Sequence, residues 1–426
     1  MWIRPIGSVF LFVCCSAISF AQVPDPLPWA NPWDVGLDYE SVNAAFSDLT
    51  EAVDNKNGPG AVGMIIKDGK IVARRAVGNM QTKIMHRGPD GDIVYTPSRQ
   101  PMMEMTIFDM ASVTKAIACT SAVMLLVERG ELTLDATVAS YIPTFGARAK
   151  DQVTVRQLIT HTSGLPAWFP FYTLFIDRQD VYRQIDEAVS LTYKPGDKRI
   201  YSDLGFIMLG RLVEEISGER LDVFTRSNLF EPLGMVDTMY LPDLQHRLRT
   251  APTEYDLFRD QELKGIVHDE NTRVMGGVSG HAGLYSTVND LAIFAQMLLN
   301  KGEWNGVRIF KEETINKMLE RQIAEGPRKK GSGFLQSREQ LIGWWGMDDK
   351  LTLHGGGGLP STSAFGHQGF TGTMIWIDPE HNCAAILLSN AVHPKREEAS
   401  KPSLFRAFYI NVSKALVGEK VNVQEP

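Results

Sequence analysis

Cysteine is scarce in this 426-residue chain, which contains four cysteines. Cys14 and Cys15 lie in an N-terminal segment that we interpret below as a removable signal, so only Cys119 and Cys383 would remain. Two thiols cannot supply the several crosslinks of a disulfide scaffold or the four ligands of a thiolate zinc site. A single bridge between Cys119 and Cys383 stays open, but unpaired buried cysteines are common and are the favoured expectation.

The chain also lacks a block of basic residues. Its 43 Lys and Arg residues against 50 Asp and Glu residues give a formal net charge of -7. The chain therefore lacks the cluster of basic residues that binding to the phosphates of nucleic acid requires. Hydrophobic residues make up 44% and charged residues 22%, which excludes a disordered or polytopic membrane protein. The length fits two or three domains, or one large domain with an insertion.

The apolar run near the N-terminus is too short to cross a bilayer, which needs about 20 residues. The run at residues 9–18 follows Arg4 and precedes a small-x-small cleavage site at residues 19–21, so residues 1–21 are expected to be a secretory signal peptide. An uncleaved anchor, a buried helix and a lipoprotein signal are the alternatives. We expect a secreted or periplasmic mature protein with no stable membrane span.

Hydrophobic periodicity predicts strand pairs near both ends of the chain and a mostly helical middle. The expected helices cover residues 39–55, 110–129, 153–160, 179–190, 205–216, 221–230, 287–300 and 403–416, and the expected strands cover 61–67, 70–78, 374–377 and 383–389. Residues 22–38 are expected to be an extended lead-in, and residues 79–105 an irregular surface excursion. Segregated strands and helices predict an α+β fold. Its antiparallel sheet, flanked by helices, would be built from both chain ends (about 39–145 and 270–426), with a helical insertion at about 146–269.

A serine and a lysine lie one turn apart at the start of the apolar segment 110–129. Ser112 and Lys115 form the only S-x-x-K sequence in the chain, and this spacing places both side chains on one helix face. A serine hydroxyl needs a nearby base to become a nucleophile, and a lysine whose pKa is depressed can be that base. Alone, the motif fits a capping serine and a solvated lysine better. However, a lysine in an otherwise apolar helix needs a reason to be there.

Two further features carry polar side chains that suit catalysis. In the segment Tyr201-Ser202-Asp203 the phenol could relay a proton and Asp203 could hold Lys115 by charge; otherwise Asp203 caps a helix. The glycine-rich segment 365–373 directly precedes a predicted strand, and such glycines let a substrate backbone approach closely. Its His367 could bind a substrate carboxylate or an active-site hydroxyl; otherwise the segment is a simple turn.

Taken in this order, the three features resemble the motifs of the serine β-lactamase and penicillin-binding-protein superfamily. The resemblance is to its class C branch, which includes D,D-peptidase and esterase relatives. The family motifs S-x-x-K, Tyr-x-Asn and His-x-Gly correspond to residues 112–115, 201–203 and 367–369. Accessory stretches at 161–166, 276–284 and 376–379 are also similar to this branch, and the resemblance covers roughly residues 40–415.

The resemblance implies a β-lactamase/transpeptidase-like fold and an acyl-enzyme mechanism without metal or cofactor. Ser112 would attack a carbonyl while Lys115 and Tyr201 move protons, and the backbone N–H groups of Ser112 and Phe370 would form the oxyanion hole. Water would then hydrolyse the acyl-enzyme. The expected substrate-binding residues are Asp203, His367, Gln368 and Gly369.

Two departures from the family pattern bear on the substrate. Asp203 replaces an asparagine and cannot donate a hydrogen bond to a substrate carbonyl, but it could hold Lys115 protonated in the resting state. His367 replaces a lysine, which weakens the fixed positive charge available to a terminal carboxylate. Both departures argue against an efficient β-lactamase.

Two other chemistries are compatible with single stretches of the sequence. Residues 277–281 nearly match the G-x-S-x-G elbow with Ser279 as the nucleophile, but a histidine stands at the last glycine. A cluster of potential metal ligands lacks any recognised spacing; it comprises His268, Asp269, Glu270 and His281.

The sequence therefore predicts an exported serine hydrolase with D,D-carboxypeptidase-like activity on peptidoglycan peptides. The alternatives are a carboxylesterase on small acyl esters, a weak β-lactamase and a non-catalytic binder of cell-wall peptide. The aromatic stretch at residues 168–175 could form an apolar wall over the cleft and favour hydrophobic esters, or it could simply pack in the core.

Overall fold

The structure is a computed structural model that describes residues 25–56, 58–322, 339–348, 357–399, 401–418 and 421. The expected signal peptide and the first residues of the lead-in lie outside this part of the chain. Among the described residues, no helix has the length and apolar character that a membrane crossing requires.

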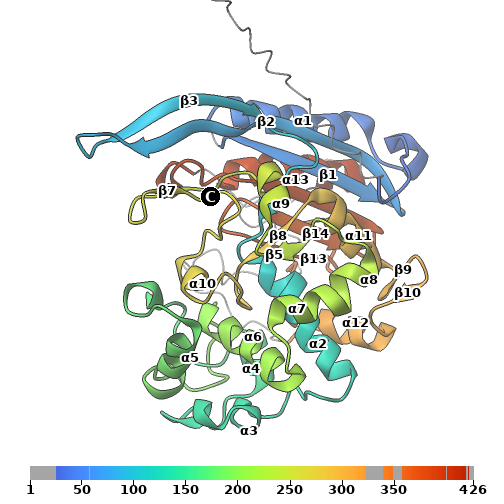
Figure 1. Ribbon diagram of the computed structural model, residues 1–426. Helices are drawn as coiled ribbons and strands as arrows, with labels where there is room; N and C mark the ends of the chain where they lie inside the picture. Colours follow the sequence, from blue (N-terminus) through green and yellow to red (C-terminus); the bar gives the residue numbers. More distant parts are fainter. Residues whose placement is uncertain are drawn as a thin grey trace, which may run out of the picture.

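One eight-stranded antiparallel sheet is assembled from both ends of the chain (Figure 1). Its strand order is β11-β12-β13-β14-β15-β1-β2-β3. The two ends meet where β1 pairs with β15, in a register that runs from Ala61 opposite Ser389 to Lys67 opposite Cys383. This pairing confirms the expected sheet. Its strands are β1 (Gly60–Lys67), β2 (Lys70–Arg87), β3 (Ile93–Pro101), β11 (Glu339–Gln340), β12 (Trp345–Gly346), β13 (Phe365–Gln368), β14 (Met374–Asp378) and β15 (Cys383–Ser389).

Both faces of the sheet are covered, because successive side chains of each strand point to opposite sides. On β1, Val62 and Met64 join one apolar core while Ala61 and Ile65 join another. The helices α1 (Tyr39–Asp54) and α13 (Lys401–Val417) pack together over one face, and α11 (Val288–Leu299) covers the other (Figure 1). Burial on both sides explains why the central strands are apolar throughout rather than alternating.

A mostly helical region lies on the α11 side of the sheet and contains the middle of the sequence (Figure 1). Its helices are α2 (Ser121–Glu128), α3 (Val138–Tyr141), α4 (Val155–Ile159), α5 (Arg178–Glu187), α6 (Asp203–Ser217), α7 (Leu221–Thr225), α8 (Glu231–Leu233), α9 (Leu244–Arg249), α10 (Glu270–Val274) and α12 (Glu312–Leu319). Short strands pair outside the eight-stranded sheet. The strands β4 (Phe108–Asp109), β5 (Met239–Tyr240) and β8 (Leu284–Ser286) form one small sheet. Two hairpins are formed by β6 (Tyr255–Asp256) with β7 (Gln261–Glu262) and by β9 (Glu303–Trp304) with β10 (Val307–Arg308).

Three expectations need correction. Residues 79–105 are not an irregular excursion, because β2 continues to Arg87 and pairs with β3 as a long arm whose two register shifts obscure the alternation. The helix expected over 110–129 is interrupted by a π-helical segment at Lys115–Thr120 before α2 begins. Cys119 and Cys383 are free buried thiols, so the possible bridge does not form.

Candidate active site

A tight turn after β4 places Ser112 at the start of the buried helical segment. The Asp109 carboxylate accepts hydrogen bonds from the backbone N–H of Ala111 at 2.8 Å and of His268 at 2.7 Å. Ala111 adopts a positive φ of 44°, which is unfavourable for alanine and is supported here by the Asp109 contact. The backbone N–H of Lys115 then donates to the carbonyl of Ser112 at 3.0 Å, which brings both side chains to the same side.

The Lys115 ammonium is fully buried, with 0% of its side chain exposed, and has three partners besides Tyr201. Its Nζ lies 3.1 Å from Ser112 Oγ, 3.0 Å from the carbonyl oxygen of His281 and 2.7 Å from Asp203 Oδ1. Burial alone would lower the pKa of Lys115, but the Asp203 carboxylate and the hydrogen bond with the Tyr201 hydroxyl raise it above its usual value. Of the two states that the sequence left open, a depressed pKa or an ammonium held by Asp203, the geometry therefore favours the ammonium in the resting state.

Tyr201 completes this group from the residues just before α6. Its hydroxyl hydrogen-bonds with Lys115 and Ser112, and Lys115 Nζ lies 4.8 Å from its ring centroid. Burial raises the pKa of Tyr201, and the nearby ammonium offsets only part of that rise. The resting site thus contains a neutral phenol, a charged ammonium and the serine hydroxyl in mutual contact.

The stretch at residues 161–166 holds Tyr201 and its neighbours in place. The His161 ring lies 4.5 Å from the Tyr201 ring, and His161 Nδ1 accepts a hydrogen bond from the backbone N–H of Ser202 at 3.0 Å. Burial lowers the pKa of His161 well below its usual value, which keeps the ring neutral and Nδ1 able to accept. The Ser202 hydroxyl donates to the carbonyl of Pro166 at 2.7 Å. This accessory stretch therefore positions the catalytic candidates without lining the cleft itself.

The loop after β13 packs directly against the turn that carries Ser112. Thr371 and Thr373 donate hydrogen bonds to the carbonyls of Asp109 and Met110 at 2.7 and 3.1 Å. A Cβ on Gly369 would stand 2.4 Å from the Met110 carbonyl oxygen, so only glycine permits this approach. The packing thus holds the loop against the residues that precede Ser112, and the oxyanion hole formed by Ser112 and Phe370 stays a prediction.

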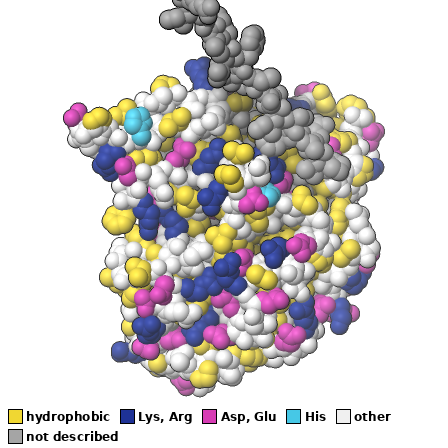
Figure 2. Space-filling model, in the orientation of Figure 1, with side chains coloured by type: hydrophobic (Ala, Val, Ile, Leu, Met, Phe, Trp, Pro, Cys, Tyr) yellow, Lys and Arg dark blue, Asp and Glu magenta, His cyan; other side chains and the backbone are white. Residues whose placement is uncertain are grey.

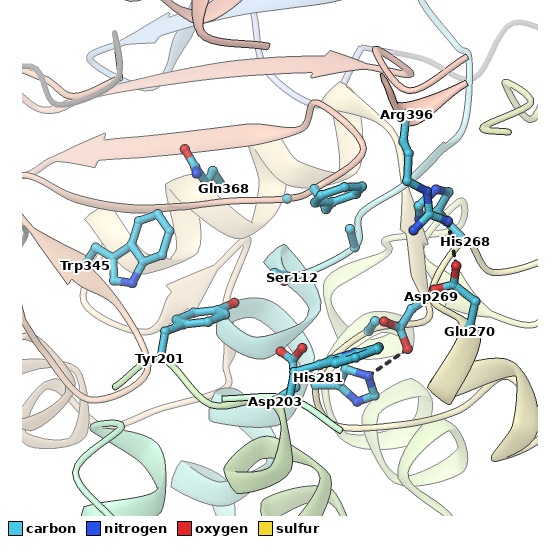
Figure 3. A pocket seen from close by; sticks show the side chains of 15 residues that line it. Ser112, Tyr201, Asp203, His268, Asp269, Glu270, His281, Trp345, Gln368 and Arg396 are labelled. Atoms are coloured by element: carbon cyan, nitrogen blue, oxygen red, sulfur yellow. Dashed lines mark hydrogen bonds and ion pairs between the residues drawn. The ribbon is translucent and has the colours of Figure 1, made fainter. Parts of the chain in front are cut away.

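A cleft of about 390 Å³ opens above Ser112 (Figure 3). Six of the predicted site residues line it: Ser112, Tyr201, Asp203, Gln368, Gly369 and Phe370. Lys115 lies beneath Ser112. His367 does not line the cleft, because it is buried and stacks on Trp345 with ring centroids 4.3 Å apart. Contact of His367 with substrate thus stays a prediction.

Sequence reasoning missed two residues that line the cleft. Trp345 forms part of the wall beside Tyr201, and Arg396 closes the opposite end (Figure 3). No local pattern marks either residue, because the strands and loops that bring them here are far apart in the sequence. The residues of the aromatic stretch at 168–175 have two different roles. Trp168 lines the cleft, whereas Phe171 is buried in the core.

The rival nucleophile Ser279 also sits in a serine–histidine–aspartate arrangement. Its Oγ lies 2.8 Å from His281 Nδ1, and His281 Nε2 lies 2.8 Å from Asp269 Oδ1. Only 4% of Ser279 is exposed, however, and it does not line the cleft. The chain Asp269–His281–Ser279 instead fixes the residue whose carbonyl holds Lys115.

The residues of the alternative metal site are engaged in separate pairs. His281 contacts Asp269, whereas His268 Nε2 lies 2.9 Å from Glu254 and Glu270 pairs with Arg396 at 2.6 Å. Across the described part of the chain, no three histidine, cysteine or acidic residues are grouped so that they could hold an ion together.

Comparisons with known proteins agree with this geometry. The family model described as Beta-lactamase matches residues 46–407. The chain is 32% identical over 374 residues to the N-acetylmuramyl-L-alanine amidase of Bacillus subtilis (strain 168), covering 82% of this chain and 80% of that protein. It is 30% identical over 427 residues, with 93% of each covered, to an Escherichia coli (strain K12) protein provisionally named a D-alanyl-D-alanine carboxypeptidase.

Solved structures show the same fold. A class C β-lactamase from Rhodobacter sphaeroides superposes with a TM-score of 0.65 at 19% identity, covering 88% of this chain and all of the other. The match of the family model over most of the chain, together with these relatives, identifies its class. The chain belongs to the β-lactamase family of serine hydrolases.

Proposed function

We propose that the protein is an exported amide hydrolase that cleaves peptidoglycan peptides through an acyl-enzyme on Ser112. The observation that carries this proposal is the contact of Ser112 Oγ with both Lys115 Nζ and the Tyr201 hydroxyl at the floor of the cleft. Export rests on the segment at residues 1–21, and N-terminal sequencing of the mature protein tests its removal.

The charged Lys115 requires a proton acceptor beyond it, and Asp203 fills that role. As Ser112 Oγ bonds to the substrate carbonyl carbon, its proton passes to the Tyr201 oxygen. The Tyr201 proton passes to Lys115, and Lys115 gives one proton to the Asp203 carboxylate 2.7 Å away. The relay leaves a neutral phenol, an ammonium and a protonated carboxyl, so charge and protons balance. The return of that proton to the leaving amine completes acylation.

The remaining steps use backbone groups and water. The N–H groups of Ser112 and Phe370 stabilise the oxyanion of the tetrahedral intermediate. Water then attacks the acyl-enzyme carbonyl and gives its proton to the same relay, which restores Ser112. Gln368, the last residue of β13, and Gly369 after it lie beyond the pairing with β12, line the cleft and would meet the substrate backbone.

The first substrate to test is a peptide ending in D-Ala-D-Ala, in line with the Escherichia coli relative. A second candidate is the amide between N-acetylmuramic acid and L-alanine, for which the Bacillus relative is named. The charge of the cleft favours this second candidate, because Arg396 is already paired with two glutamates and offers a terminal carboxylate less attraction. Both substrates share the same acyl-enzyme chemistry.

Intact-mass detection of an acyl adduct tests the proposal. The panel is a D-Ala-D-Ala peptide, an N-acetylmuramyl-L-alanine peptide, a penicillin and a p-nitrophenyl ester. We expect Ser112→Ala to abolish both the adduct and hydrolysis, while Ser279→Ala still forms the adduct, with Ser112 as the labelled residue. Hydrolysis above a few per cent in Ser112→Ala would overturn the assignment. Turnover of the ester alone would favour a carboxylesterase, turnover of penicillin alone a β-lactamase, and binding without an adduct a non-catalytic binder.

A further inference from the structure

The side chain of Lys401, at the start of α13, contacts both the ring and the backbone of Phe370. Its Nζ lies 3.7 Å from the centroid of the Phe370 ring and donates a hydrogen bond to the Phe370 carbonyl oxygen at 2.8 Å. An ammonium over an aromatic face is attracted by the negative quadrupole of the ring. An ionised donor also makes a stronger hydrogen bond than a neutral one. One side chain therefore holds Phe370 in two ways.

Phe370 lies where the proposed reaction needs a fixed backbone donor. It lines the cleft together with Ser112. No backbone carbonyl among the described residues accepts a hydrogen bond from the Phe370 N–H, so this donor stays available to a substrate oxygen. A donor of an oxyanion hole has to be oriented before the reaction begins, because reorientation during the reaction would cost part of the stabilisation.

The other contacts of the loop hold its remaining residues. Thr371 and Thr373 attach the loop to the carbonyls of Asp109 and Met110, as described above. The backbone N–H of Gly369 donates to the carbonyl of Thr373 at 2.7 Å. Within the part of the chain that the structure describes, the hydrogen bond from Lys401 is the only one made to Phe370 itself. The orientation of this residue therefore depends on Lys401.

Two more side chains contact the Phe370 ring. The guanidinium carbon of Arg396 lies 5.8 Å from the ring centroid, and the His268 ring stacks on it with centroids 5.6 Å apart. Figure 3 shows Arg396 and His268 together at this end of the cleft. Glu254 lies 2.6 Å from Arg396 and 2.9 Å from His268, so a carboxylate fixes both groups. The ring thus packs against an ordered cluster that also contains Lys401.

The surroundings of Lys401 set the pH at which it loses its proton. Burial and the like charge of Arg396 lower the pKa of Lys401 to about 8, and the Glu254 carboxylate acts in the opposite direction. The other titratable or charged groups on the neighbouring segments and the first turns of α13 are His268, Asp269, Glu270, Lys395, Glu397, Glu398 and Arg406. Lys401 is therefore an ammonium at pH 7 and a neutral amine in mildly alkaline solution.

We propose that Lys401 is a positioning residue that holds Phe370 by its carbonyl and its ring, so that the Phe370 N–H points at the oxyanion of the tetrahedral intermediate. The inference rests on the proposed acyl-enzyme function and adds to it a residue outside the cleft. Lys401 is not among the residues that line the cleft, so it acts through Phe370. Loss of its proton removes the attraction to the ring and weakens the hydrogen bond to the carbonyl.

Steady-state kinetics with a p-nitrophenyl ester test the proposal. Lys401→Met keeps an unbranched apolar side chain without the charge and the donor, and we expect it to lower kcat about tenfold with little change in KM. Lys401→Arg keeps a cation that can stack on the ring, so kcat at pH 7 should stay within about twofold of wild type. Lys395→Met is the matched control, because Lys395 Nζ lies 5.3 Å from the Tyr95 ring instead. It should leave kcat unchanged.

The pH dependence of kcat separates this role from a merely structural one. Wild-type kcat should fall as pH rises through about 8, because Lys401 then loses its charge. Lys401→Met and Lys401→Arg should both lack this alkaline limb, the first because it has no proton to lose and the second because a guanidinium stays charged. The same alkaline limb in all three proteins would overturn the proposal, as would a wild-type kcat for Lys401→Met.

Phenylboronic acid provides a readout that does not depend on turnover. Its boron bonds to Ser112 Oγ with release of the serine proton, and one boronate oxygen then occupies the position of the oxyanion. We expect Lys401→Met to lower its affinity, measured by calorimetry, about tenfold, whereas Lys395→Met should not change it. Equal affinities for wild type and Lys401→Met would overturn the positioning role and leave the proposed function standing. Hydrolysis by Ser112→Ala would instead contradict the proposed function.

Discussion

Asp203 determines the proton chemistry of the site more than any other single residue. The family motif has an uncharged asparagine at this position, whereas this chain puts a carboxylate 2.7 Å from a fully buried ammonium. Two opposite charges at that distance in a desolvated site stabilise each other strongly. Lys115 therefore starts the reaction protonated, and a relay that ends on Asp203 follows from that state.

Substituting Asp203→Asn should change the pH dependence of acylation. Without the carboxylate, burial dominates and lowers the pKa of Lys115, so the lysine could lose its proton and act as the base directly. We expect kcat/KM at pH 7 to fall by about 100-fold and to recover in part as pH rises. The acid limb of the pH–rate profile should move to higher pH. An unchanged acid limb would remove Asp203 from the relay.

At this scale the sequence predicted identities better than protonation states. Ser112, Lys115 and Tyr201 were found from short motifs, and the structure brings them into contact. The charge of Lys115 was left open between a depressed pKa and an ammonium held by Asp203, and the third contact of Lys115, the His281 carbonyl, could not be foreseen because it lies 166 residues away. Arg396 was also missed, because its role in the cleft depends on ion pairs with Glu254 and Glu270 that lie far away in the sequence.

At the scale of structural elements, the loop at residues 275–283 positions Lys115, because it carries the His281 carbonyl that accepts a hydrogen bond from Lys115 Nζ. Arg178 of α5 donates hydrogen bonds to the carbonyls of Met275 at 3.0 Å and Val278 at 3.0 Å. The same guanidinium pairs with Glu214 of α6 at 2.8 Å. One side chain thus joins two helices to the loop that positions Lys115.

Replacing Arg178→Lys should loosen this loop, because an ammonium cannot reach three acceptors with the geometry of a guanidinium. We expect kcat to fall about tenfold with little change in KM, and the free energy of unfolding to fall by about 1–3 kcal/mol. Steady-state kinetics and urea unfolding measure both effects. The matched control is Arg183→Lys on the same helix, where an exposed arginine pairs with Asp180. A wild-type kcat for Arg178→Lys would show that the loop keeps its conformation without the hydrogen bonds from Arg178.

The long elements were predictable, and the short or irregular ones were not. The expected helix at 287–300 matches α11 (Val288–Leu299), because a threonine cap and continuous apolar residues mark it clearly. The arm formed by β2 and β3 was missed, because its polar, solvent-facing side chains resemble a loop. The π-helical turn at Lys115 was also missed, because backbone hydrogen-bond spacing leaves no trace in hydrophobic periodicity.

At the scale of the whole molecule, a buried carboxyl couples stability to pH. Asp290 of α11 accepts hydrogen bonds from the Asp237 N–H at 2.8 Å and the Thr238 hydroxyl at 2.7 Å. Burial raises the pKa of Asp290 to about 7. The folded chain therefore binds a proton that the unfolded chain releases at about pH 4. The free energy of unfolding should fall as pH rises from about 4 to 7 and then level off.

Asp290→Asn should flatten that dependence, because an amide oxygen can accept the same two hydrogen bonds without ionising. The full difference amounts to at most about 4 kcal/mol, since one pKa unit corresponds to about 1.4 kcal/mol. Urea unfolding at pH 5 and pH 7.5 measures it. The exposed Asp54→Asn serves as the control and should keep the wild-type slope. Parallel pH dependences for wild type and Asp290→Asn would contradict the assignment.

The fold as a whole was predicted correctly because its strands fall at the two ends of the sequence. On the face shown in Figure 2, basic and acidic side chains are intermixed without an extended area of one charge. The outline of a sheet with a helical region beside it required only hydrophobic patterning. The order of the eight strands required contacts that patterning does not contain.

The junction of β1 with β15 has a consequence for how the chain acquires its structure. The Ser389 hydroxyl donates to the Gly60 carbonyl at 2.8 Å across a separation of 329 residues. A growing polypeptide cannot form this junction until almost all of it has been synthesised. Until then, the backbone N–H and C=O groups of β1 that pair with β15 stay unpaired. Chains halted before residue 383 would keep β1 without its neighbour, and such intermediates tend to aggregate rather than mature.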